Sequence, residues 1–485
     1  MKLQFGKYQI FKGIFFLLLI SMVAFSCRKD EIIDTDPSIK LSFSTDTVIF
    51  DTVFTTLGSA TKGFKIYNTN NNTVKISSLR LAGGSNSFYT INVDGVAATS
   101  LKDIEINGND SIYIFVRVRI DPTNQNNPFI VTDSILFETN GNMQDVDLVA
   151  YGQNAHFYAN TVYQVNGIWT NDLPHVVYGY VIIDSLYSLT ITPGTQVYMH
   201  RNSILAVASD ATLKIQGTLT DPVIFQGDRL EEDYKDLPGQ WGAIWLSAGS
   251  YDNEIDYAII KNGIIGIRVD TLGNSPNPTL RLTNTEILNM TGYGLLAQGS
   301  YVDAANCVFA NCGESAVVLS IGGTYDFRHC TIGNFWNHTV RQTASLVLNN
   351  YYLLINELGF ITDTIARDLH KAYFGNCIVY GNNENELFQS RTVQAAFNYT
   401  FDHCLLKTEI LTDPNYVECL FNQDPLFTDY NNNDYSLDSI ISPAVNYGAM
   451  DVINSSILDI TFDIEGISRT ADGEPDLGAY EYQER

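Results

Sequence analysis

The chain has 485 residues, of which 45% are hydrophobic and 17% are charged. A chain of this length and composition can bury a large core, and we expect two or three domains. The formal net charge of −26 opposes binding to the phosphate backbone of nucleic acids and to anionic membrane surfaces, so neither is expected as a partner.

Residues 1–26 have the pattern of a signal peptide. Lys2, Lys7 and Lys12 form a basic flank, and the apolar run from Gly13 to Val23 is too short to cross a bilayer. We therefore expect this segment to be removed on export.

The signal ends in Ala24-Phe25-Ser26-Cys27, which resembles a bacterial lipobox, in which the cysteine thiol becomes acylated. The resemblance implies that residues 27–38 are a lipidated tether to the outer membrane; an ordinary signal peptide followed by an unmodified cysteine is the alternative. Lys29, Asp30 and Glu31 resemble the export signal that sends Bacteroidetes lipoproteins to the exterior face. A solvated tether on the periplasmic face is the alternative.

Residues 39–155 break into short alternating strands separated by turn residues such as Asn140-Gly141. Strands at this spacing predict an antiparallel β-sandwich. The segments FDTVFTTLGSATKGFKIYNTN, DSILFETNG and VDLVAYG resemble Hydin-type immunoglobulin-like domains. That resemblance implies a spacer or binding module without catalytic groups.

A repeat occupies residues 156–420. Four segments align without gaps and close on an asparagine: Tyr257–Asn262, Asn284–Asn289, Asn306–Asn311 and His329–Asn334. A period of about 22 residues fits one coil of a right-handed parallel β-helix, in which like residues stack about 4.8 Å apart. The intervening strands are expected to present apolar residues outward, which favours a covered outer face; these are Ile244, Leu296 and Val318.

One position of the repeat is repeatedly a cysteine, at Cys307, Cys330, Cys377 and Cys404. Disulfides are the usual expectation in an exported protein, but a row of small apolar side chains on the inward face favours buried free thiols. Because the chain has no Cys-x-x-Cys motif, we expect neither a metal site nor a cofactor.

The asparagines that close the repeat are predicted to be structural. Asparagine tolerates left-handed backbone, and amides that stack at a corner can bond one another. A ligand-binding row is the alternative. The four residues are Asn262, Asn289, Asn311 and Asn334.

The last stretch of the chain resembles the end of bacterial surface β-helix proteins of the polymorphic outer-membrane kind. The matching positions are Asp424, Pro425, Tyr435, Leu437, Ser442, Pro443, Ala444, Gly448, Asp463, Gly466, Arg469, Asp476, Gly478, Ala479, Tyr480 and Glu481. With the repeat, the resemblance implies a Bacteroidetes β-helix lipoprotein. Residues 421–485 are predicted to cap the open end of the helix.

Inside this cap, Arg469 is predicted to pair with a buried carboxylate, because a buried charge requires a partner of opposite sign. The candidates are Asp463, Asp476 and Glu481. A catalytic pair of carboxylates is the alternative.

The favoured function is non-catalytic glycan binding, adhesion or scaffolding at the cell surface, with glycans or a cell-surface protein as partners. Parallel β-helices also act on polysaccharides, so a polysaccharide lyase or glycoside hydrolase is the alternative. Carboxylates beside a basic side chain suit proton abstraction from a uronate, although a charged loop is commonly just solvated. The candidate residues are Asp228, Arg229, Glu231, Glu232, Asp233, Lys235, Asp236, Arg268 and Asp270.

Eight Asp-Ser/Thr-aliphatic triplets resemble the sequon that Bacteroidetes use for O-glycosylation. The same triplets suit the entry into a strand after a turn, and both interpretations can hold together. Thr271 is favoured because it precedes an inserted loop. The hydroxyl residues are Thr47, Thr52, Ser111, Ser134, Ser185, Thr271, Thr364 and Ser439.

Overall fold

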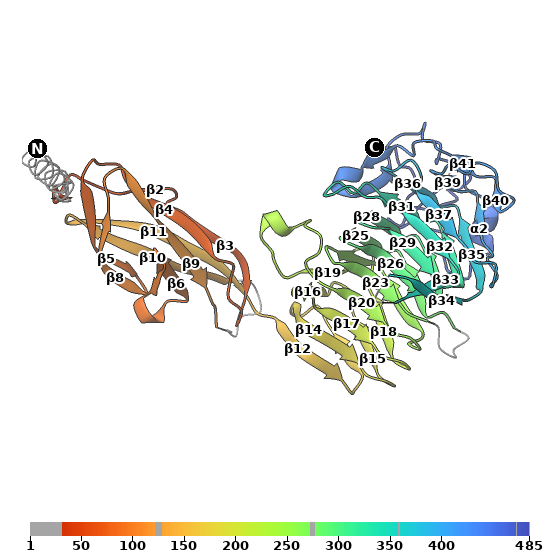
Figure 1. Ribbon diagram of the computed structural model, residues 1–485, viewed down its shortest axis with the longest axis horizontal. Helices are drawn as coiled ribbons and strands as arrows, with labels where there is room; N and C mark the ends of the chain where they lie inside the picture. Colours follow the sequence, from red (N-terminus) through yellow and green to blue (C-terminus); the bar gives the residue numbers. More distant parts are fainter. Residues whose placement is uncertain (1–31, 122–128, 272–276, 357–358, 472, 485) are drawn as a thin grey trace, which may run out of the picture. The chain divides into compact units, whose positions relative to one another are not determined.

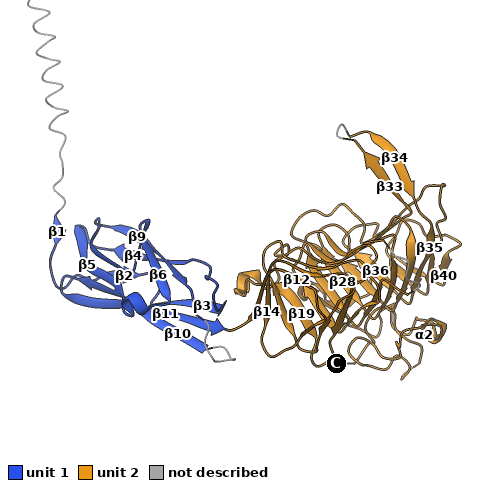
Figure 2. Ribbon diagram, turned by 90° about the horizontal axis from the view of Figure 1, so that it is seen from below, with its two compact units in different colours: residues 1–123, 128–153 blue, residues 124–127, 154–485 orange. Residues whose placement is uncertain are grey.

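The computed structural model describes residues 32–121, 129–271, 277–356, 359–471 and 473–484. The predicted signal peptide, Cys27 and the export signal Lys29, Asp30 and Glu31 lie outside these residues. The chain divides into two compact units, residues 1–123 with 128–153 and residues 124–127 with 154–485 (Figure 2). Among the described residues, no helix is long and apolar enough to cross a membrane.

The first unit is a sandwich of two β-sheets. One sheet has the order β1 (Ile33–Asp34), β5 (Thr73–Leu81), β10 (Phe129–Thr139), β11 (Asn142–Gln153) and β3 (Thr47–Phe54), with β8 (Ser100–Ile106) also paired to β5. The other has the order β2 (Ser42–Phe43), β4 (Lys62–Asn68), β9 (Asp110–Val118), β6 (Tyr89–Val93) and β7 (Val96–Ala98).

Alternation along the strands builds the core of this sandwich. In β9, Ile114, Val116 and Val118 are buried while the residues between them are exposed. Asn140 and Gly141 join β10 to β11 with positive φ at both positions, 49° and 82°. This is the turn that the twist of a tight hairpin requires.

The second unit is a parallel β-helix in which three strands form each coil, so that three stacks of parallel strands run along it (Figure 1). The first stack comprises β13 (Gly167–Trp169), β15 (Ser188–Ile191), β18 (Thr212–Gln216), β21 (Asn253–Asp256), β24 (Leu280–Thr283), β27 (Tyr301–Ala305), β30 (Gly323–Arg328), β35 (Leu369–Gly375), β38 (Thr400–Asp402) and β40 (Tyr416–Val417).

The second stack comprises β16 (Gln196–Met199), β19 (Val223–Gly227), β22 (Ala258–Lys261), β25 (Glu286–Met290), β28 (Val308–Cys312), β31 (Thr331–Asn334), β36 (Ile378–Gly381), β39 (Leu405–Leu406) and β41 (Leu420–Phe421). The third comprises β17 (Ile204–Val207), β20 (Ala243–Leu246), β23 (Ile265–Val269), β26 (Tyr293–Gln298), β29 (Val317–Ser320), β32 (Leu346–Asn349) and β37 (Leu387–Ser390). At the N-terminal end, β12 (His156–Tyr163) pairs with β14 (His175–Ile183). Strand β14 pairs in turn with β16 of the second stack and with β17 of the third.

Like residues stack inside the coil. The rings of Phe327, Phe374 and Phe401 follow one another on the first stack, with centroids 5.2 and 4.7 Å apart. On the second stack, the four predicted cysteines occupy one inward row, and each is buried and free. Burial raises the pKa of Cys377. Its thiol therefore stays protonated and donates to the carbonyl oxygen of Phe327 at 3.5 Å.

A left-handed residue stands at the corner before most strands of the second stack. The φ angles are 48° at Asn284, 52° at Asn306, 49° at His329 and 53° at Asn376. Asn306 Nδ2 donates to Asn284 Oδ1 at 3.0 Å, and Asn376 Nδ2 lies 2.9 Å from His329 Nε2. The polar side chains that bond one another from coil to coil therefore lie just before the strands of the second stack.

The predicted amide ladder at the other end of these strands is wrong. Asn262, Asn289 and Asn311 do have positive φ, but their side chains have other roles. Asn262 bonds Lys235 O, and Asn311 bonds Asn433 Oδ1. Asn334 bonds the backbone of Cys312 through both its oxygen and its nitrogen, and the amide of Asn289 lines a cleft.

The predicted outward position of Ile244 is also wrong. Ile244 lies in register with Leu205 and Ile267 and is completely buried inside the coil. Trp245 is the outward residue and aligns with Arg268, which in turn aligns with Leu296. A shift of one residue in a strand exchanges the two faces, and the register of β20 is one residue away from the predicted one.

The C-terminal segment packs along the side of the helix, against the outer face of the second stack. It contains β42 (Phe427–Asp429), β43 (Asp434–Leu437) and α2 (Met450–Asn454). Its apolar residues Leu437, Leu477 and Ala479 share a core with Val308 and Ile378 of the coils. This lateral packing covers outward apolar residues of the second stack, such as Val308 and Ile378, whereas the sequence predicted a cover for the open end.

Arg469 holds this segment together. Its side chain is completely buried, and Nη1 lies 2.6 Å from Glu481 Oε1. Nη2 donates to Asn306 Oδ1 at 2.9 Å and to the carbonyl oxygens of Gly478 and Ala479. Asp463 and Asp476 accept backbone N–H groups of the same segment. The carboxylates of Glu481, Asp463 and Asp476 therefore each have an ion-pair or hydrogen-bond partner within this segment.

Candidate functional site

The charged loop before Trp241 does not gather its residues at one point. Asp228 Oδ2 lies 2.7 Å from His200 Nδ1 and accepts the hydroxyl of Tyr178. Arg229 pairs with Glu231 at 3.0 Å. The loop is thus divided between ion pairs of its own and contacts with neighbouring coils.

The remaining candidates are also separated. Glu232 and Asp233 start a short 3-10 helix, and Glu232 pairs with Lys235 at 3.8 Å. Arg268 pairs with Asp270 at 2.8 Å, and Asp270 accepts the indole N–H of Trp245. Only Lys235 and Asp236 of the nine candidates line the cleft described next.

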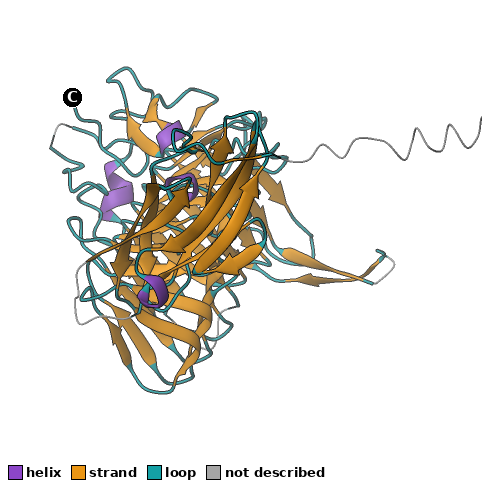
Figure 3. Ribbon diagram, turned by 90° about the vertical axis from the view of Figure 1, so that its left-hand side faces the viewer, coloured by secondary structure: helices purple, strands orange, loops and turns teal. Residues whose placement is uncertain are grey.

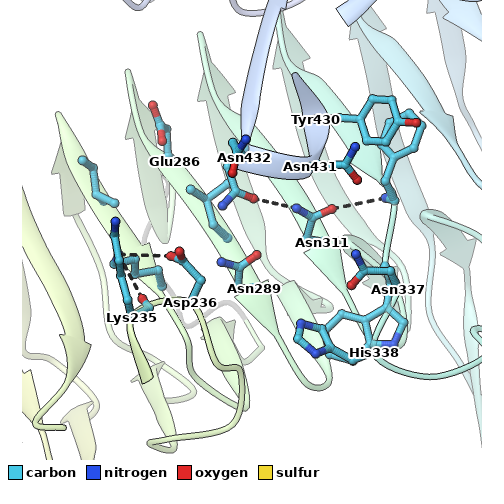
Figure 4. Close-up of a pocket in the computed structure, with 16 residues that line it drawn as sticks. Lys235, Asp236, Glu286, Asn289, Asn311, Asn337, His338, Tyr430, Asn431 and Asn432 are labelled. Atoms are coloured by element: carbon cyan, nitrogen blue, oxygen red, sulfur yellow. Dashed lines mark hydrogen bonds and ion pairs between the residues drawn. The ribbon is translucent and has the colours of Figure 1, made fainter. Parts of the chain in front are cut away.

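A cleft of about 480 Å³ opens on the outer face of the second stack (Figure 4). Three segments that are distant in the sequence surround it: the charged loop at residues 235–236, the loop at 335–338 after β31, and the C-terminal segment at 430–433. Strands β22, β25 and β28 provide its floor. The lining residues are Lys235, Asp236, Ile259, Lys261, Glu286, Leu288, Asn289, Asn311, Phe335, Trp336, Asn337, His338, Tyr430, Asn431, Asn432 and Asn433.

Two aromatic rings stacked on each other form one wall of this cleft. Phe335 and Tyr430 stack with centroids 4.0 Å apart and an interplanar angle of 15°. Phe335 is half-buried and Tyr430 is exposed. The backbone N–H of Phe335 donates to Asn311 Oδ1 at 3.3 Å, and the hydroxyl of Tyr435 donates to the same oxygen at 2.9 Å. These bonds fix the wall to the floor.

The opposite side of the cleft is charged. Lys261 Nζ lies 3.4 Å from Asp236 Oδ1 and also donates to Lys235 O. These contacts tie the charged loop to strand β22. The cleft therefore offers charged groups at one end, amides on the floor and an aromatic surface at the other end (Figure 4).

A buried ion pair supports the loop at 335–338. Arg341 donates to both carboxylate oxygens of Glu386, at 2.8 and 2.6 Å, and also to Asn334 O. Glu386 accepts further bonds from Ser345 and from the N–H of Asn383. The two side chains of the pair are 2% and 0% exposed. The turn after β31, which carries Trp336 and His338, is therefore held by this buried polar cluster.

Glu286 is the one carboxyl on the floor of the cleft. It aligns with Ile259 and Val308, so it occupies a row that is otherwise apolar. Burial raises the pKa of Glu286 to about 7, against the opposing effect of a hydrogen bond with Tyr480. Near neutral pH this carboxyl can therefore carry a proton and donate a hydrogen bond.

We expect Glu286→Gln to change the pH dependence of stability. Because the folded pKa is raised, the contribution of Glu286 to stability is full below its unfolded pKa and is lost as pH rises through about 7. From pH 5 to pH 8, the variant should gain on the order of 1–3 kcal/mol relative to wild type. Chemical denaturation of both proteins at the two pH values measures this. Glu409→Gln, at an exposed position, is the control; an equal difference at both pH values would contradict the assignment.

The predicted glycosylation residues differ in exposure. Ser185 is exposed, at a turn where Leu186 has a φ of 73°. Thr271 is half-buried, and its hydroxyl oxygen accepts a hydrogen bond from Arg367 Nη1 at 2.9 Å. Ser185 is thus more accessible than the favoured Thr271. The others are half-buried: Thr47, Thr52, Ser111, Ser134, Thr364 and Ser439.

Comparisons with known proteins do not identify a family. No protein-family model matches the chain, and no curated protein is similar to it. Among solved structures, a family 123 glycoside hydrolase from Clostridium perfringens is 11% identical, with 27% of this chain and 31% of that chain covered and a TM-score of 0.19. This chain thus spans about a third of the hydrolase.

Two further structures share a small part of the chain. The PapD-like domain 7 of human CEP192 is 8% identical, with 27% of this chain and 94% of that chain covered and a TM-score of 0.17. The E. coli chaperone DraB is also 8% identical, with 24% and 55% covered and a TM-score of 0.17.

Proposed function

We propose that this protein binds glycans through the cleft on the outer face of the second stack, as a lipid-anchored protein of the cell envelope that faces the exterior. The observation that carries the proposal is the Phe335–Tyr430 stack beside a floor of amides. Aromatic faces pack against the apolar faces of sugar rings, and amides donate to and accept from hydroxyl groups. The cleft size suits a ligand of a few rings.

We expect Tyr430→Ala to weaken glycan binding at least tenfold, because the exposed half of the aromatic wall is lost. A glycan array probed with wild-type protein identifies the ligand, and the same array probed with the variant measures the loss. The matched control is Tyr352→Ala, because Tyr352 is a 50% exposed tyrosine of the hairpin β33 (Tyr351–Ile355) and β34 (Ile361–Ala366). Equal binding by Tyr430→Ala and wild type would contradict the proposal.

Polysaccharide cleavage is the second candidate, and Glu286 is the observation that favours it. A carboxyl with a raised pKa in a cleft is the group that general acid catalysis needs. Release of reducing or unsaturated ends from a polymer that the array identifies would support cleavage. Loss of that release in Glu286→Gln, with binding retained, would assign the acid to this residue.

The anchor and its side of the membrane are tested separately. We expect Cys27→Ser to release the protein from the membrane fraction and to abolish acyl labelling, whereas Cys419→Ser should leave both unchanged. Replacement of Lys29, Asp30 and Glu31 by alanine should retain the protein on the periplasmic face and protect it from protease added to whole cells. Unchanged fractionation of Cys27→Ser would refute the anchor.

A further inference from the structure

Three metal-binding side chains meet at the first coil of the β-helix. His156 begins β12, His175 begins β14, and Asp172 lies in the turn between β13 and β14. One ligand atom from each side chain lies within 4.8 Å of the other two. His156 Nε2 and Asp172 Oδ2 are 3.1 Å apart. The spacing in the sequence follows no zinc motif, so the strand pairing alone brings these residues together.

The ring of His175 is held in one orientation. It is 2% exposed and stacks on Trp169, with centroids 4.7 Å apart and an interplanar angle of 15°. Nε2 lies 2.9 Å from the carbonyl oxygen of Thr170, and Nδ1 lies 3.0 Å from the hydroxyl of Tyr158. A carbonyl oxygen only accepts, so Nε2 carries the proton and Nδ1 accepts from Tyr158.

We propose that His156, Asp172 and His175 bind a divalent zinc ion, which fastens the turn of residues 170–174 to strand β12. Two imidazoles and one carboxylate suit zinc, whereas calcium and magnesium prefer sets of oxygen ligands. Whichever ring nitrogen of His175 binds the ion gives up its present hydrogen bond, and the other nitrogen keeps its own, to the Thr170 carbonyl oxygen or to the Tyr158 hydroxyl. Metal-binding histidines are commonly oriented by such a bond from the second nitrogen.

The place of this site at the first coil indicates how a bound zinc ion would stabilise the β-helix. In the second unit, β12 is the first strand of its sheet and pairs with β14. Unpaired strand edges open readily. A metal bridge from β12 to the next turn closes the first coil, and zinc should therefore raise the melting temperature of the β-helix.

The test is a titration of the full mature chain with zinc chloride by isothermal calorimetry, with melting temperature as a second measurement. We expect one site per chain and a rise in melting temperature. His156→Gln and Asp172→Asn should each weaken binding at least tenfold and abolish the rise. Both side chains are substantially exposed, at 40% and 54%, so these variants should keep the fold.

The matched control is His200→Gln, because His200 and Asp228 form another histidine–aspartate pair, at 2.7 Å. The control should bind zinc as wild type does. The proposal is overturned by an absence of zinc binding in wild type, by unchanged binding in both site variants, or by an equal loss in His200→Gln.

Discussion

Arg469→Ala is expected to detach the C-terminal segment from the β-helix and to cost roughly 3–5 kcal/mol, because it leaves buried carboxylates without their cation. The guanidinium is completely buried and pairs with Glu481 at 2.6 Å. Burial already raises the pKa of Glu481 to about 7, and Arg469 opposes that rise. Without the guanidinium, Glu481 must take up a proton or become exposed to water.

Two measurements test this expectation. Chemical denaturation gives the loss of stability, and limited proteolysis should cut the variant within residues 421–485 before the coils. Arg391→Ala, at an exposed position, is the control. Stability and proteolysis equal to wild type would show that the ion pair does not hold the segment.

Arg341→Ala is expected to cost a similar roughly 3–5 kcal/mol and also to weaken glycan binding. Glu386 is 0% exposed and would lose Arg341, the cation with which it pairs. The loop that carries Phe335 would then lose its bond from Arg341 to Asn334 O, and the aromatic wall would move. Stability and affinity should therefore fall together.

A second variant separates the two effects. Glu386→Gln keeps the shape of the cluster and removes the buried charge, so it should lose less affinity than Arg341→Ala. Arg201→Ala, at an exposed position, is the control for a lost surface arginine. Unchanged affinity in Arg341→Ala, despite a measured loss of stability, would show that the loop does not depend on this cluster.

Side-chain periodicity explains why the coils could be predicted. Cys307, Cys330 and Cys377 occupy equivalent inward positions on successive coils. Residues that repeat along the sequence therefore stack on one another in the fold. Alternation alone does not decide the offset of a short apolar strand such as β20, and the predicted outward position of Ile244 is wrong for this reason. The predicted amide ladder is misplaced for a similar reason, since asparagines with positive φ stand at both ends of the repeated segment and only their side-chain hydrogen bonds distinguish them.

The cleft could not be predicted from the sequence, because no local pattern marks it. Lys235, Phe335 and Tyr430 are about a hundred residues apart in the chain and meet only because the coils bring two loops to the same side and the C-terminal segment packs beside them. The signal that was available lay in Glu286, a carboxyl in a row of apolar residues between Ile259 and Val308. The pair of Arg341 and Glu386 likewise joins a loop to a later coil.

The most direct measurement of glycan binding at this cleft is a crystal structure of the protein with the strongest array ligand. We expect electron density for a sugar ring packed against the outer face of Tyr430 in the Phe335–Tyr430 stack, with hydroxyl groups within hydrogen-bond distance of Asn289 and Glu286. Sugar density at another face of the protein, with this cleft filled only by solvent, would contradict the proposal.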